Sequence, residues 1–261
     1  MRKALWVLLP LFLLSAWTAG RPSTGEAARE GSGDIESPAD LIKAMRARYD
    51  GKWYRTLAFL QMSIQHNADG SRDTTYWHEA LEIPGKLRID FEPLDAGNGM
   101  LFRDGTLYRI RNGKVTGSQQ QEHALMLLGF DVYFLSPEQT LARLAKLGFD
   151  LTKMHESTWQ GRPVYVVGSE TDDERRSRFW IDRERLYFVR VVQPVPDGSL
   201  RETQFNGYRP LGGGWIAPEV LFFVNGNVVF EEYYRDVKTG MTFDASVFDP
   251  ERWREGVRRG K

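Results

Sequence analysis

The sequence predicts a mainly β (α+β) protein in which an antiparallel sheet is partly wrapped around helices. Three observations support this fold class. Apolar residues repeat with a period of two between residues 53 and 115, more strand-like segments separated by turn residues continue to the C-terminus, and helical patterns occur before and within the strands. Because no fixed-period repeat and no internal linker interrupts this pattern, we expect one domain over residues 37–253.

The composition excludes several classes of protein. A hydrophobic fraction of 41% and an aromatic fraction of 13% are too high for a disordered chain. Lys and Arg number 35, as do Asp and Glu, so no excess of positive charge indicates a nucleic-acid partner. The chain has no cysteine, which removes disulfides, thiolate metal sites and cysteine nucleophiles together.

The N-terminus has the pattern of a secretory signal peptide over residues 1–20. Arg2 and Lys3 precede an apolar run over residues 4–16, and small residues follow it. The run is too short to span a bilayer comfortably, although an uncleaved anchor is the alternative. We therefore expect an exported, periplasmic protein in which residues 21–36, rich in Gly, Ser, Ala and Glu, form a flexible leader.

The domain is expected to begin with a helix. Ser37 is a typical N-cap and Pro38 a typical first helical residue, so residues 38–49 are predicted to be helical up to the Asp50-Gly51 pair. Strands joined by tight turns follow, with Asp104-Gly105 and Asn112-Gly113 as hairpin turns. Within this meander the apolar residues Leu87, Ile89 and Phe91 alternate with charged residues, which is typical of a strand that buries only one side.

Helices are predicted to interrupt the strands. Residues 123–134 are strongly apolar, and residues 125–134 are apolar nearly all round, which favours a buried helix. Ser136 with Gln139 forms a capping box for a helix through Leu147. The later strands are predicted over residues 151–158, 164–168, 178–181, 187–193, 200–208, 215–224 and 228–237, for about ten in all, and residues 254–261 are expected to be a basic tail.

No motif indicates catalysis or metal binding. His78 and Glu82 have the spacing of a helical zinc-protease motif, but they lie in a stretch patterned as a strand. Residues four apart on a strand are about 13 Å apart, which is too far for a shared metal ion. No serine lies in a nucleophile elbow and no Gly-rich loop precedes a helix, so we expect no enzyme, catalytic residue, metal or cofactor.

Several short motifs, taken in order, resemble the LolA/LolB-like lipoprotein-carrier superfamily, which includes outer membrane lipoprotein-sorting proteins. They are Ile83-Pro84-Gly85-Lys86-Leu87-Arg88, Asp104-Gly105-Thr106-Leu107-Tyr108, Phe179-Trp180-Ile181-Asp182, Trp215-Ile216-Ala217-Pro218, and the ending from Phe243-Asp244 to Phe248-Asp249-Pro250. The resemblance implies an incomplete antiparallel β-barrel whose concave apolar face is covered by helices and binds acyl chains.

The resemblance leads to a functional hypothesis, a periplasmic carrier or sensor that binds a lipid or an acylated protein in an apolar cavity. Transient contact with a membrane is compatible with this role. A twelve-carbon chain would contribute on the order of 10 kcal/mol on burial before ordering costs. The alternative is a protein-interaction module of the cell envelope that uses the concave sheet, and an enzyme with a half-barrel pocket is less favoured. The residues expected to line the cavity are one strand face, Leu60, Met62, Ile64, Leu87, Ile89 and Phe91, together with the helix residues Leu125, Leu128 and Phe134. Alternation alone leaves the choice of strand face open.

Overall fold

The computed structural model describes residues 35–171 and 176–256, and the predicted signal peptide and nearly all of the leader lie outside these ranges. These described residues form one compact unit. No helix among the described residues is long and apolar enough to cross a membrane.

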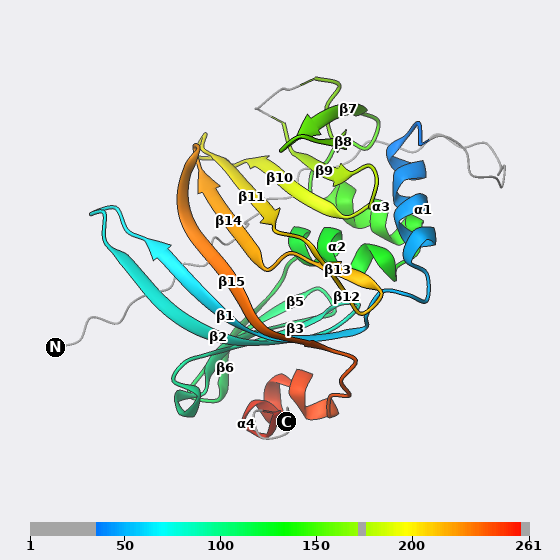
Figure 1. Ribbon diagram of the computed structural model, residues 1–261. Helices are drawn as coiled ribbons and strands as arrows, with labels where there is room; N and C mark the ends of the chain where they lie inside the picture. The colour runs from blue at the N-terminus through cyan, green and yellow to red at the C-terminus, as the bar shows by residue number, and fades with distance from the viewer. Residues whose placement is uncertain (1–34, 172–175, 257–261) are drawn as a thin grey trace. The chain divides into compact units, whose positions relative to one another are not determined.

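One antiparallel sheet of thirteen strands dominates the fold, in the order β6-β5-β4-β3-β2-β1-β15-β14-β11-β10-β9-β8-β7 (Figure 1). Its strands are β1 (Thr56–His66), β2 (Arg72–Glu82), β3 (Lys86–Phe91), β4 (Asn98–Arg103), β5 (Thr106–Arg111), β6 (Lys114–Gln120), β7 (Met154–Trp159), β8 (Arg162–Val167), β9 (Arg178–Asp182), β10 (Phe188–Pro194), β11 (Leu200–Asn206), β14 (Glu219–Val224) and β15 (Asn227–Thr239). The edge strands β6 and β7 do not pair with each other, so the barrel is not closed. The predicted incomplete antiparallel barrel is confirmed.

The N-terminal helix and the helices between β6 and β7 lie on one side of this sheet (Figure 1). The first is α1 (Pro38–Tyr49), capped by the Ser37 side chain as predicted. The chain between β6 and β7 forms α2 (Ala124–Gly129), the 3-10 turn η2 (Asp131–Tyr133) and α3 (Pro137–Lys146). The α3 helix begins with the predicted capping box. We call the face of the sheet that these helices cover the inner face.

The C-terminal segment covers part of the opposite, outer face, beside β3 to β6 (Figure 1). It consists of η3 (Ala245–Phe248), η4 (Pro250–Arg252) and α4 (Trp253–Gly256), and a further 3-10 turn, η1 (Leu94–Ala96), links β3 to β4. Trp253 packs with Leu101 and Ile110 of the sheet. Gly99 makes room for this tryptophan, because a Cβ there would lie 2.5 Å from the Trp253 ring.

Three predicted elements differ from the structure. Residues 123–134 form the short α2 and η2 in place of one helix, because the Asp131 carboxylate accepts hydrogen bonds from the Gly85 amide and Arg143 and thereby holds a bend. Residues 215–224 form two strands, β13 (Gly214–Ile216), which pairs with β12 (Arg209–Leu211), and β14; Pro218, which has no amide hydrogen to donate, lies between them. Residues 254–256 of the expected basic tail belong to the helical turn α4, which begins at the fully buried Trp253, and residues 257–261 lie outside the described residues.

Candidate ligand-binding faces of the sheet

Strand register identifies which side chains share the inner face. Residues paired directly across an antiparallel ladder point to the same side, so Leu57, Leu81 and Leu87 share a face. Phe102 pairs with Leu87, and its ring lies 4.7 Å from that of His123, the N-cap residue of α2. These residues therefore belong to the inner, concave face.

The register divides the six predicted strand residues between two faces. Leu87, Ile89 and Phe91 of β3 lie on the inner face, whereas Leu60, Met62 and Ile64 of β1 lie on the outer one. The expectation that all six share a face is thus corrected. The physical reason is that β1 is apolar on both sides, and on the inner face it presents Leu57, Phe59, Gln61 and Ser63.

The helix residues of the predicted site lie in the layer over the inner face. Leu128 is fully buried, whereas Leu125 and Phe134 are half-buried. The Arg55 guanidinium lies 4.9 Å from the centre of the Phe134 ring. Phe91, at the end of β3, is also half-buried. Whether these residues line a lipid cavity stays a prediction.

Aromatic side chains that the sequence reasoning did not select extend across the inner face. Trp77 on β2 lies 5.0 Å from Phe91 and 5.6 Å from Phe230 on β15, measured between ring centres. Phe222 on β14 lies 5.6 Å from Phe230. This row of four aromatic rings provides a broad apolar surface. In the sequence, only the alternation of side chains along β2 could have placed Trp77 on the inner face.

A polar cluster lies beside this row. The Gln61 amide donates to the Ser63 hydroxyl at 2.9 Å, and the Tyr234 hydroxyl donates to the Glu232 carboxylate at 2.9 Å. Burial raises the pKa of Glu232 to about 7 and, with the nearby Glu232 charge as a second cause, raises the pKa of Glu79 well above its usual value. At neutral pH this face therefore carries less negative charge than its two glutamates suggest.

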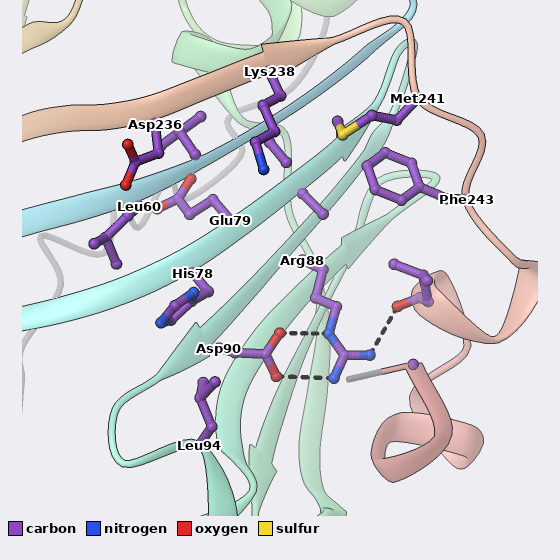
Figure 2. Close-up of a pocket in the computed structure, with 15 residues that line it drawn as sticks. Leu60, His78, Glu79, Arg88, Asp90, Leu94, Asp236, Lys238, Met241 and Phe243 are labelled. Atoms are coloured by element: carbon purple, nitrogen blue, oxygen red, sulfur yellow. Dashed lines mark hydrogen bonds and ion pairs between the residues drawn. The ribbon is translucent and has the colours of Figure 1, made fainter. Parts of the chain in front are cut away.

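A cavity of about 300 Å³ lies against the outer face, between the sheet and the C-terminal segment (Figure 2). Arg88 and Asp90 form a doubly hydrogen-bonded ion pair there, with Nε–Oδ2 at 2.6 Å and Nη2–Oδ1 at 2.8 Å. Arg88 also donates to the carbonyls of Val247 and Trp253. This network corrects the expectation that β3 buries only its apolar side, because Arg88 is only 2% exposed.

An open antiparallel sheet with helices over its concave face defines a class of half-barrel folds, and several solved structures are similar to this chain. It is similar to an outer membrane lipoprotein-sorting protein domain from Vibrio parahaemolyticus, with a TM-score of 0.57, 15% identity and coverage of 83% of this chain and 97% of the other. A DUF1329 family protein from Desulfovibrio piger gives 0.55 and 16%, with coverage of 81% and 95%. A LolA superfamily protein from Nitrosomonas europaea gives 0.54 and 11%, with coverage of 79% and 96%. The chain has a fold similar to that of these three proteins, as the resemblance of the sequence motifs predicted.

No family model matches the sequence, and no curated protein matches it either. At these low identities the likeness concerns the fold alone.

Proposed function

We propose that the protein is a non-enzymatic periplasmic carrier or sensor that binds a lipid or an acylated protein on the inner face of the sheet. The observation that carries this proposal is the apolar inner face of an unclosed sheet, which bears the aromatic row and lies beneath half-buried apolar side chains of the helices. A closed barrel would fill this face with its own core, whereas in this open sheet separate helices with half-buried apolar side chains cover it.

The energetics suit an acyl chain. Each methylene removed from water contributes about 0.8 kcal/mol, and the inner face around the buried rings of Trp77 and Phe230 is apolar like such groups. The partly neutralised Glu79 and Glu232 reduce the cost of placing an apolar chain beside them.

Uptake of a fluorescent fatty acid tests the proposal. Phe91→Lys and Leu125→Lys place a charge at half-buried positions on the inner face and in α2, and each should weaken uptake roughly tenfold or more while circular dichroism stays unchanged. Ile64→Lys is the matched control, because Ile64 is also half-buried but lies on the outer face. Absence of uptake by the unchanged protein, or equal losses in all three variants, would refute the inner-face site.

Native mass spectrometry of the gently purified protein distinguishes the two kinds of ligand. Co-purifying lipid supports the carrier or sensor. A defined protein partner without lipid would instead support the interaction module that the sequence left open.

A further inference from the structure

We infer that the outer-face cavity is a second ligand site, which takes a small amphiphile with an apolar body and one anionic group. This site is separate from the inner face and does not depend on the proposed function. The cavity has a floor on β1, β2 and β3, one wall on the end of β15, and another on the C-terminal segment (Figure 2).

The apolar part of the cavity is incompletely covered. Leu60, Leu94, Met241 and Phe243 line it and are each only half-buried, although they surround a space within the fold. Apolar surface left in contact with water in a concave site is the usual basis of small-molecule binding. Phe243 and Met241 form one wall of the cavity, and the unbranched methionine side chain can adapt to the shape of a ligand.

The charged groups around the cavity determine whether an anionic or a cationic ligand is favoured. The donors of Arg88 are occupied by Asp90 and the two C-terminal carbonyls, so this pair is already neutral. The His78 ring lies 2.9 Å from the Glu92 carboxylate, to which it is hydrogen-bonded. A cation that could attract an anionic ligand must therefore be a group other than Arg88.

Lys238 is the group that remains. Its ammonium points into the cavity in Figure 2 and forms no ion pair with the residues that the structure describes. The Asp236 carboxylate is turned away from it (Figure 2), and strand register places the Glu79 side chain on the inner face of the sheet. An anionic group beside Lys238 is therefore the favoured polar end of a ligand.

The volume sets the size of the ligand. A water molecule occupies about 30 Å³ in the liquid, so 300 Å³ corresponds to about ten waters or a ligand of about ten non-hydrogen atoms. Octanoate has this size and the required chemistry. For so few atoms, a dissociation constant roughly between micromolar and millimolar is expected.

Methionine methyl groups report on the two faces separately. Met241 lines the outer cavity, whereas Met100 pairs with Ile89 on the inner face. In the full mature chain labelled with ¹³C-methyl methionine, octanoate should shift the Met241 resonance at lower concentration than that of Met100. A long-chain fatty acid should shift Met100 if the proposed function holds, so failure of one site is distinguishable from failure of the other.

Variants complete the test. Lys238→Gln should weaken octanoate binding on the order of fivefold and leave binding of neutral octanol unchanged. Leu60→Glu should abolish the Met241 shift, whereas Ile64→Glu, on the same face of β1 but outside the cavity, should not. An unshifted Met241 resonance, equal octanoate binding by the Lys238 variant, or tighter binding of octylammonium than of octanoate would each overturn the proposal.

Discussion

Arg88 is expected to be the main attachment of the C-terminal segment to the sheet. Its guanidinium forms the ion pair with Asp90, donates to Val247 and Trp253 at 3.0 and 2.9 Å, and lies 3.6 Å from the centre of the Trp253 ring. Arg88→Met would keep the apolar stem but leave the Asp90 carboxylate without its partner. Breaking a buried ion pair in this way costs about 3–5 kcal/mol of the free energy of unfolding.

Urea unfolding measures this cost, and a double-mutant cycle assigns it to the pair. Asp90→Leu alone should also destabilise, but the double variant Arg88→Met/Asp90→Leu should recover about 2 kcal/mol relative to the sum of the single changes. Amide hydrogen exchange over residues 243–256 should accelerate in Arg88→Met before the rest of the sheet is affected. Removing Arg183, whose ion pair with Glu156 is exposed, is the control and should cost less than about 1 kcal/mol. Strictly additive single changes at Arg88 and Asp90 would refute the reasoning.

Two further predictions concern pH and export. Burial raises the pKa of Glu232 to about 7 and the pKa of Glu79 well above its usual value, so the folded state holds protons that the unfolded state releases. These groups therefore make the free energy of unfolding fall as pH rises above about 4.5. Glu79→Gln should therefore raise the Tm at pH 8 and flatten this fall in thermal scans across pH, and a lower Tm at pH 8 would contradict the assignment. Cleavage of the signal peptide should leave a mature chain that begins near Arg21, as read by N-terminal sequencing of the periplasmic fraction; recovery of Met1 in the membrane pellet would indicate an anchor instead.

Elements fixed by local chemistry could be predicted from the sequence. The Ser37 and Ser136 caps each act within one helical turn, and the Asn112-Gly113 turn joins adjacent strands, so neighbouring residues suffice to identify them. The 123–134 segment could not be predicted in the same way, because its bend depends on the hydrogen bond between Asp131 and the distant Gly85 amide. A pattern within the segment carries no information about that contact.

The division of the predicted site between two faces has the same kind of cause. Alternation in β1 establishes that Leu60 and Phe59 point to opposite sides, but not which side the helices cover. The buried face of a strand is usually identified as its less polar face. Here this criterion fails, because the C-terminal segment also covers the outer face near β3 and β4. Arg88 consequently appears polar in the sequence although it is buried in the fold.

The adjacent residues Glu231 and Glu232 of β15 show that the pKa of a side chain depends on the face of the sheet on which it lies. Glu232 lies on the inner face, where burial raises its pKa, whereas Glu231 pairs with Ile64 on the outer face. Although burial of Glu231 acts in the opposite direction, hydrogen bonds from Tyr233 and His66 lower its pKa. Two identical neighbours thus acquire opposite shifts because the strand turns them to different surroundings. In an open sheet covered on both sides, the assignment of faces therefore determines which residues belong to the proposed acyl-chain site and which belong to the proposed outer-face site.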